Sequence, residues 1–136
     1  MSTFSWPVRV YWEDTDAGGV VYYGNYLKFL ERARTEWLRS CGFSQQALAK
    51  DPGIIFPVMD LRIHYKRPAR LDDELLISCE ARARGATAIN FAQRITVGAH
   101  TLAEADVQVV CVDAGTFRPT RLPSFLMDAL SAPEPQ

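Results

Sequence analysis

The sequence has 136 residues, of which 48% are hydrophobic and 23% charged, and its formal net charge is -1. This length predicts one globular domain spanning residues 1–136, and the composition argues against a disordered chain or a membrane span. Because 15 basic side chains are balanced by 16 acidic ones, a nucleic-acid partner is not expected.

The N-terminal part of the chain is predicted to form a strand, a loop and a long helix. In residues 7–13, PVRVYWE, apolar and polar side chains alternate as they do in a strand with one buried face. Residues 25–41 change to helical spacing and predict an amphipathic helix of more than four turns. Asn25 suits the N-cap of this helix, and Gly42 suits the position after its last turn. The apolar face of the predicted helix contains Tyr26, Leu27, Leu30, Ala33, Trp37, Leu38 and Cys41.

Most of the remaining chain is predicted to form an antiparallel sheet. Short links between consecutive strands favour antiparallel neighbours. The expected architecture is α+β, with one long central helix wrapped by a five-stranded antiparallel sheet. The helix covers one face of this sheet, and the other face is expected to need a partner, which predicts a homo-oligomer. The later elements are strands at 57–66, 74–84, 87–97 and 101–113, a short helix at 123–130, and a frayed SAPEPQ end.

Three cysteines, Cys41, Cys79 and Cys111, are widely spaced and form no CxxC motif. Their odd number and spacing argue against a disulfide framework and a zinc site, and favour a reducing compartment. The first residues lack the basic and apolar regions of a secretion signal. We therefore expect a cytoplasmic protein.

The stretch WEDTDAGGVVYYGNY, residues 12–26, places three acids beside glycines and aromatic bulk. The simplest interpretation is solvated acidic charge near the positive end of a helix. A calcium loop beginning at Asp14 is disfavoured, because its fifth position is Gly18 and its twelfth is Asn25 instead of glutamate. The same DxD could begin a phospho-aspartyl phosphatase, but that chemistry needs a doubly wound parallel sheet. No metal or cofactor is expected.

A further interpretation combines one carboxylate with one helix start. Asp16 lies close to the predicted helix, and the N–H groups of residues 19–24 are candidates for unpaired donors that polarise a carbonyl. Gly18 and Gly19 allow a ligand to approach the backbone closely. The sequence contains no GxSxG serine and no obvious general acid. A thiolate, with a thiol pKa near 8.5, can leave without a proton, so a thioester is the favoured substrate class.

The stretch YWEDTDAGGVVYYGNYLKFLERARTEWLR, residues 11–39, resembles the acyl-CoA thioesterases of the hotdog fold. It is most similar to the branch associated with the Tol–Pal envelope system, which is related to 4-hydroxybenzoyl-CoA thioesterases. The likeness continues through residues 64–77 and 109–123. The resemblance implies a long helix wrapped by an antiparallel sheet, and subunits that pair edge to edge with active sites at the dimer interface. It further implies a homodimer or homotetramer that hydrolyses acyl-CoA, with acyl carrier protein as a possible partner.

The resemblance also assigns roles to residues. It implies that Asp16 is the catalytic carboxylate, as general base or nucleophile, and that backbone N–H groups near Tyr23 hold the substrate carbonyl. The predicted substrate-binding residues are Gly18, Gly19, Val20, Tyr22, Asn25, Arg67, Arg118 and Arg121, with the arginines placed on CoA phosphates. The alternative is a non-catalytic hotdog module that binds acyl-CoA or an acyl carrier.

Tyr23 is where this chain departs from many members of the Tol–Pal branch, which carry histidine there. Aroyl-CoA thioesterases can carry tyrosine at this position. A tyrosine with a pKa near 10 cannot replace histidine as a base at neutral pH, but it can line an acyl pocket. The preference for short, longer or aromatic acyl groups stays open at this point.

Overall fold

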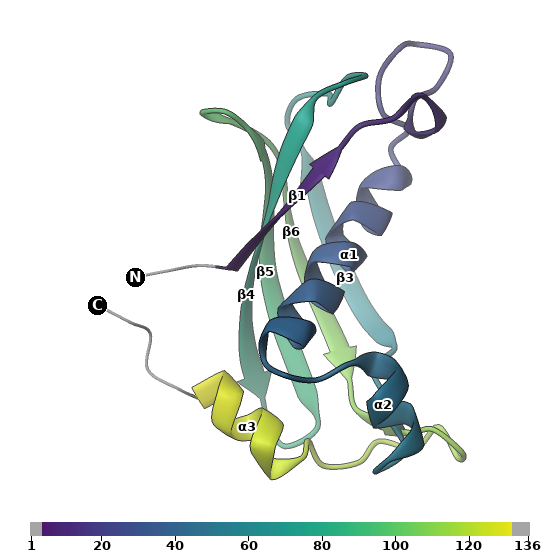
Figure 1. Cartoon of the computed structure of the whole chain (residues 1–136), viewed down its shortest axis with the longest axis vertical. Helices are drawn as coiled ribbons and strands as arrows, with labels where there is room; N and C mark the ends of the chain where they lie inside the picture. The colour runs from purple at the N-terminus through teal and green to yellow at the C-terminus, as the bar shows by residue number, and fades with distance from the viewer. Residues whose placement is uncertain (1–3, 132–136) are drawn as a thin grey trace.

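The computed structural model describes residues 4–131. Of the SAPEPQ end that was predicted to fray, Ser131 is helical and residues 132–136 lie outside the described residues. Five antiparallel strands form one sheet in the order β1-β4-β5-β6-β3, and helix α1 lies across one of its faces (Figure 1). This confirms the predicted α+β architecture. The elements of this layer are β1 (Phe4–Arg9), α1 (Asn25–Ser40), β3 (Val58–Tyr65), β4 (Glu74–Arg84), β5 (Ala88–Val97) and β6 (His100–Val110).

The first strand is shorter and lies earlier than predicted. β1 ends at Arg9, and Trp12–Asp14 form a 3-10 turn, η1, where the alternating pattern predicted strand up to residue 13. Val10 is fully buried as expected, but Trp12 is 80% exposed because the chain has already left the sheet. Pro7 is tolerated within β1 because this strand lies at an edge of the sheet, where a missing N–H breaks no central ladder.

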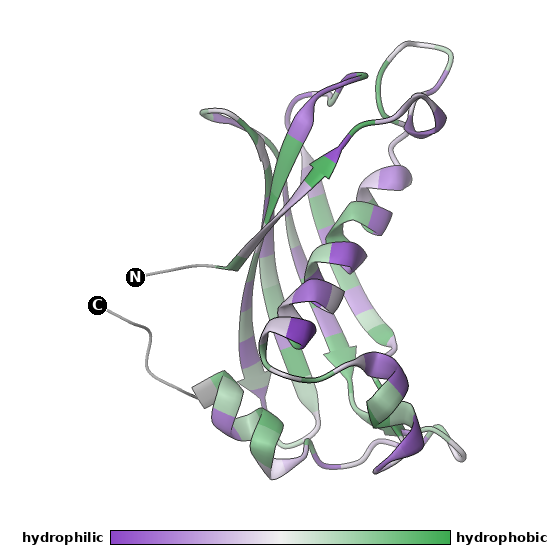
Figure 2. Cartoon of the chain, in the orientation of Figure 1, coloured by the Kyte–Doolittle hydropathy of each residue, from purple (hydrophilic) through white to green (hydrophobic). Residues whose placement is uncertain are grey.

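Helix α1 buries one side against the sheet and keeps the other side polar, which Figure 2 shows as alternating bands of colour. Its buried side chains are Tyr26, Phe29, Leu30, Ala33 and Leu38. Phe29 is an addition to the predicted face, and Leu27 is a correction because it is 38% exposed. The N-cap is Gly24, so the assignment of Asn25 as N-cap is wrong. Gly42 follows the C-cap with a φ of 96°, as predicted.

The two faces of the sheet have opposite character because side chains alternate along each strand. Phe91 faces Val107 across the β5–β6 pair, and both lie in the core beneath α1. On the opposite face Arg94 pairs with Glu104 at 3.0 Å. That outer face is already polar, so its composition does not support the expectation that it needs a covering partner. Exposed apolar side chains occur instead at the β3 edge, where Met59 is 64% exposed.

The remaining elements close the end of the sheet away from the acidic loop (Figure 1). The final predicted strand ends at Val110, and β7 (Val112–Asp113) pairs instead with β2 (Ile54–Ile55) in a separate small sheet. Helix α3 (Ser124–Ser131) confirms the predicted terminal helix, whereas α2 (Gln45–Lys50) is an addition to the prediction. None of the described helices is long and apolar enough to cross a bilayer.

Candidate active site

The loop between β1 and α1 is fixed against one end of the sheet (Figure 1). Thr15 forms a bridge with Val21 inside the loop, and Val20 forms a bridge with Arg70 in the β3–β4 connection. Val21 also donates its N–H to the carbonyl of Ala69 at 2.9 Å. The Val21 side chain is part of the core, so it anchors the loop and is not exposed to a ligand.

Asp16 is exposed at the bend of this loop. Its Oδ1 accepts the N–H of Gly18 at 2.8 Å, and its own N–H donates to the carbonyl of Val20 at 2.9 Å. A Cβ at Gly18 would lie 3.2 Å from the same carboxylate oxygen, whereas Gly19 has open space around it but a φ of 80°. The two predicted glycines therefore serve the loop in different ways: Gly18 leaves room for the carboxylate, and Gly19 permits the turn.

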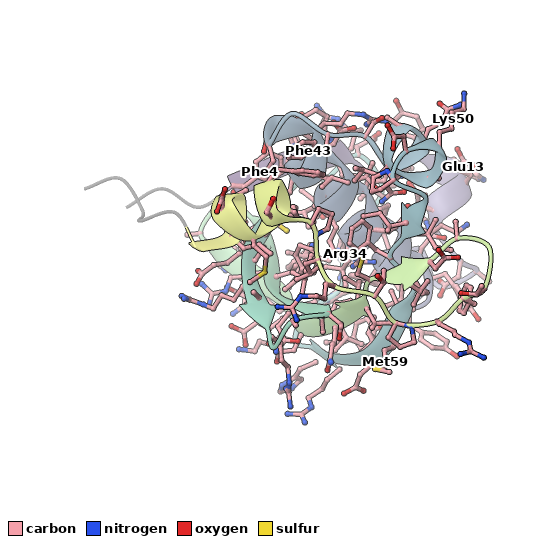
Figure 3. The ribbon with its side chains drawn as sticks, turned by 90° about the horizontal axis from the view of Figure 1, so that it is seen from below. Phe4, Glu13, Arg34, Phe43, Lys50 and Met59 are labelled. Atoms are coloured by element: carbon pink, nitrogen blue, oxygen red, sulfur yellow. The ribbon has the colours of Figure 1, made fainter. Side chains whose placement is uncertain are left out.

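Asp14, two residues earlier, is buried and fully engaged. Its Oδ2 accepts the backbone N–H of Tyr11 at 2.8 Å, and its Oδ1 accepts the side-chain N–H of Asn25 at 2.6 Å. Its carbonyl also accepts the N–H of Tyr22 at 3.0 Å. The structure thus separates a structural acid from the accessible Asp16. Glu13, predicted to end a strand, instead lies exposed in η1 (Figure 3).

The start of α1 offers backbone donors on the same loop. Asn25 donates its N–H to the carbonyl of Tyr22 at 2.8 Å. The N–H groups of Tyr23 and Gly24 have no hydrogen-bond acceptor within the described part of the chain, residues 4–131. Unpaired amides are expected at a helix N-terminus, where they favour negative charge. An accessible carboxylate and two available N–H donors therefore lie on one continuous segment.

Aromatic rings surround this helix start. The Tyr22 and Tyr23 rings, both exposed, lie 4.9 Å apart, and Tyr65 packs edge-on against Tyr23 at 6.4 Å and Tyr26 at 5.1 Å. A hydrogen bond and the charge of Tyr23 raise the pKa of the Tyr22 hydroxyl. Sequence reasoning missed Tyr65 as a site residue, because its strand position gives no signal that it reaches the loop.

The predicted arginines lie at two different ends of the sheet. Arg67 follows β3 at the end that holds the Asp16 loop, and its Nη1 lies 3.0 Å from Nδ1 of His100. Arg118 and Arg121 follow β7 at the other end. β6 has 11 residues, so the two ends lie roughly 35 Å apart. Within one chain the structure brings Arg67 near the loop, but not Arg118 or Arg121.

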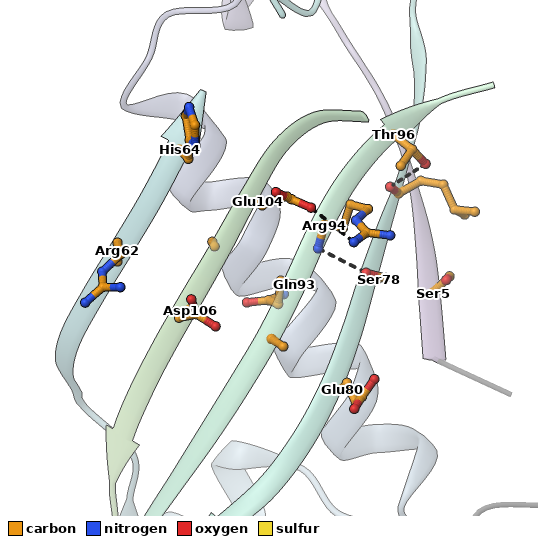
Figure 4. Close-up of a pocket in the computed structure, with 13 residues that line it drawn as sticks. Ser5, Arg62, His64, Ser78, Glu80, Gln93, Arg94, Thr96, Glu104 and Asp106 are labelled. Carbon is orange, nitrogen blue, oxygen red and sulfur yellow. Dashed lines mark hydrogen bonds and ion pairs between the residues drawn. The ribbon is translucent and has the colours of Figure 1, made fainter. Parts of the chain in front are cut away.

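A hollow lies on the outer face of the sheet, opposite α1 (Figure 4). It is an open groove of ≈ 620 Å³ whose lining includes Arg62, His64 and Asp106. Glu104 in this groove accepts Lys66 at 2.8 Å as well as Arg94. The hydrogen bond and charge of Lys66, followed by those of Arg94, lower the pKa of Glu104.

Among the described residues, no cluster of His, Cys, Asp or Glu is arranged to hold a metal.

A smaller cavity of ≈ 150 Å³ lies between α1 and the sheet. Arg34 reaches into this interior, whereas Met59 points outward (Figure 3). The Arg34 guanidinium donates to Oε1 of buried Gln93 at 3.1 Å, and Gln93 donates to the carbonyl of Leu30 at 3.0 Å. Burial lowers the pKa of Arg34. The cavity walls are otherwise mostly apolar, and Phe91 is among them.

Comparison with known proteins adds family evidence to this geometry. Residues 10–130 match the Thioesterase-like superfamily. The chain is 50% identical over 125 residues to the acyl-CoA thioester hydrolase YbgC of Escherichia coli, covering 91% of this chain and 92% of that protein. A solved 1,4-dihydroxy-2-naphthoyl-CoA thioesterase from Synechocystis superposes with a TM-score of 0.88 at 27% identity, covering 95% of this chain and 96% of the other. A solved probable thioesterase from Bartonella henselae superposes with a TM-score of 0.86 at 34% identity, covering 90% of this chain and 100% of the other.

Proposed function

This chain belongs to the Thioesterase-like superfamily of hotdog enzymes, and we propose that it hydrolyses acyl-CoA thioesters with Asp16 as its catalytic carboxylate. The observation that carries the proposal is the exposed Asp16 on the same fixed loop as the unpaired N–H groups of Tyr23 and Gly24. A carboxylate beside oxyanion donors suits acyl transfer to water. The relative named acyl-CoA thioester hydrolase, at 50% identity, supports the substrate class.

The N–H groups of Tyr23 and Gly24 form the proposed oxyanion hole. They donate to the thioester oxygen, which gains negative charge as the carbonyl carbon becomes tetrahedral. Fixed donors aimed at that developing charge lower the barrier because they need no reorganisation during the reaction. The positive end of α1 adds to the same stabilisation.

Asp16 supplies the attack on the carbonyl carbon by one of two routes. As a base, it takes a proton from water while the water oxygen bonds to the carbon. As a nucleophile, its own oxygen forms a mixed anhydride that water then hydrolyses. In both routes the C–S bond breaks and sulfur leaves with the electron pair as a thiolate. That step needs no general acid, because a thiol pKa near 8.5 makes the thiolate a good leaving group.

A second copy of the chain completes the proposed site. β3 is an edge strand whose apolar side chains include exposed Val58 and Met59. A two-fold axis through two β3 edges makes the strands antiparallel. It therefore brings the far end of the partner, with Arg118 and Arg121 of the partner subunit, toward the Asp16 end of this chain. Cationic side chains from both subunits then contact the CoA phosphates.

The acyl group is proposed to lie against the exposed rings of Tyr22 and Tyr23, with Val20 beside them. Aromatic walls favour an aromatic or longer acyl group over acetyl. A solved relative named as a 1,4-dihydroxy-2-naphthoyl-CoA thioesterase supports the aromatic option. We propose a cytoplasmic location, and the free thiols of Cys41, Cys79 and Cys111 support it. The sequence resemblance to the Tol–Pal branch suggests a role beside the cell envelope.

The deciding experiment measures free-thiol release from a panel of thioesters, from acetyl-CoA to palmitoyl-CoA, with benzoyl-CoA, naphthoyl-CoA and one acyl carrier protein thioester. Wild type should turn over at least one member, and Asp16→Asn should lose about 10²- to 10⁴-fold in kcat while remaining folded. Binding without turnover of any member would favour a non-catalytic module. Full turnover by Asp16→Asn would remove Asp16 from the mechanism.

The same assay can separate the two routes. A single turnover of excess enzyme in ¹⁸O water labels the Asp16 carboxylate if that carboxylate attacks the thioester carbonyl and water then opens the mixed anhydride at the aspartyl carbonyl. Label in Asp16 establishes the nucleophile route, whereas label found only in the released acid excludes opening of an anhydride at the aspartyl carbonyl. Mass spectrometry of the peptide that contains Asp16 reads the difference directly.

A further inference from the structure

The last residue of edge strand β3 reaches the start of helix α1. The Tyr65 hydroxyl donates to the backbone carbonyl of Tyr23 at 2.7 Å, across 42 residues of sequence. It is a hydrogen bond between a β3 side chain and the peptide that enters the helix. The family comparison and the acidic motif give no role to this residue.

This bond determines where the next amide points. The peptide between Tyr23 and Gly24 is trans, since the described chain has its cis bond at Asp51–Pro52. In a trans peptide the C=O and the following N–H point in opposite directions within one plane. A Tyr23 carbonyl held by Tyr65 therefore directs the unpaired Gly24 N–H away from Tyr65.

We propose that Tyr65 is a positioning residue for thioester hydrolysis, which aims the Gly24 N–H at the substrate carbonyl oxygen. This inference rests on the proposed function above and adds a residue from β3 to a site otherwise formed by the loop. The bond to the carbonyl also polarises the peptide, and polarisation strengthens the N–H donor on its other side. Tyr65 thus acts on the oxyanion through the 23–24 peptide without touching the substrate.

The surroundings of Tyr65 suit this task. Its ring is held edge-on by Tyr26, whose own hydroxyl accepts the N–H of Ala69 at 2.9 Å. Burial, followed by the neighbouring Tyr26 and Tyr23, raises the pKa of the Tyr65 hydroxyl. The hydroxyl therefore stays protonated, and remains a donor, at neutral and mildly alkaline pH.

Gly24 is also adapted to its place. Its φ of -70° is open to any residue, so backbone strain does not require glycine. A Cβ there would instead lie 3.0 Å from Cε2 of the Tyr22 ring. The absent side chain lets the ring of Tyr22 pack closely against the peptide that carries the donor.

The test is Tyr65→Phe, which removes the hydroxyl and keeps the ring. We expect kcat to fall about 10-fold with KM changed less than about twofold, because an oxyanion bond is stronger in the transition state than in the bound substrate. Since a half-exposed hydrogen bond adds little stability, Tm should change by no more than about 2 °C. The Gly24 amide resonance should shift in ¹H–¹⁵N spectra of the resting enzyme, which reports the lost bond without any turnover.

Two matched variants separate positioning from general packing. Tyr11→Phe removes an exposed hydroxyl and should leave kcat unchanged. Tyr26→Phe leaves the Ala69 N–H without its partner, so it should lower Tm more than Tyr65→Phe and kcat less. The inference would be overturned if kcat fell in proportion to the fall in Tm when Tyr65→Phe and Tyr26→Phe are compared.

Other outcomes are equally decisive. Wild-type kcat in a folded Tyr65→Phe enzyme, an unshifted Gly24 resonance, or failure of Tyr65→Phe to fold would each contradict a positioning role. If Asp16→Asn is inactive while Tyr65→Phe is fully active, the positioning role alone fails. If both variants are fully active, the proposed site itself is wrong.

Discussion

The side-chain amide of Asn25, at the first turn of α1, donates to the buried carboxylate of Asp14 at 2.6 Å. Because the same carboxylate accepts the Tyr11 N–H, it ties the end of β1 to the start of the helix. This pair holds the ends of the loop that presents Asp16.

Asp14→Asn should destabilise the fold more than it impairs the chemistry. An amide in place of the carboxylate has one acceptor oxygen for two donors, so one buried donor loses its partner. We expect a loss of about 1–3 kcal/mol in the free energy of unfolding, measured by urea denaturation. kcat should fall much less than in Asp16→Asn. The assignment of Asp14 as structural fails if Asp14→Asn keeps wild-type stability but loses turnover.

The two loop glycines should respond differently to alanine. In Gly18→Ala the new Cβ lies 3.2 Å from the Asp16 carboxylate, so the carboxylate must shift. We expect kcat to fall about 10-fold with little change in Tm, since small misplacements of a reacting group are costly. In Gly19→Ala the Cβ meets nothing, but the φ of 80° is strained for alanine. That variant should lose about 1 kcal/mol of stability. If Gly18→Ala lost stability and Gly19→Ala lost kcat instead, the roles assigned to these two glycines would be contradicted.

The β3 edge should control assembly. Val58→Lys combined with Met59→Lys puts two charges on the exposed apolar edge and should convert the proposed oligomer to monomer in light scattering, with loss of turnover. The matched control is Leu76→Lys, which changes a 46% exposed side chain lining the outer groove. It should leave both mass and turnover unchanged. Dissociation by Leu76→Lys alone would instead place the essential contact on the outer face.

Stability should depend on pH through Glu104. Its pKa is lowered in the folded state by Lys66 and then Arg94, so the charged form is favoured by folding. The resulting stabilisation is present above the ordinary glutamate pKa of about 4.3 and is lost as pH falls through the lower folded value. The Tm difference between wild type and Glu104→Gln should therefore vanish in acid. Added salt should reduce this Tm difference at neutral pH because the Lys66–Glu104 ion pair is exposed. A difference that persists in acid would contradict this cause.

Local patterns in the sequence predicted the elements well where burial alternates regularly. The spacing of apolar residues located α1, and short Gly-containing links located the β4–β5 and β5–β6 turns. The alternation failed after Val10, because Trp12 continues an apolar pattern while its side chain is exposed. Asn25 is a good N-cap residue by type, but the helix already begins at Asn25 with Gly24 as its N-cap, and the side-chain N–H of Asn25 donates to Asp14.

The candidate site could be predicted only where its residues lie on one segment of the chain. Asp16 and the helix amides belong to a single stretch, so residue type and order were sufficient to single them out. Tyr65 reaches this stretch through the register of β3 on β6, which pairs it with Ala103, and sequence gives no such register. The location of Arg118 at the opposite end of the sheet is likewise a property of the topology.

The bond from Tyr65 to Tyr23 links edge strand β3 to the proposed oxyanion donor at Gly24. If β3 is also the strand that pairs with a second copy of the chain, assembly and turnover both depend on the position of β3. By mass action, dilution that separates the subunits would loosen β3 and with it the Gly24 donor. Specific activity would then depend on enzyme concentration, and substrate that bridges both subunits would in turn hold the dimer together.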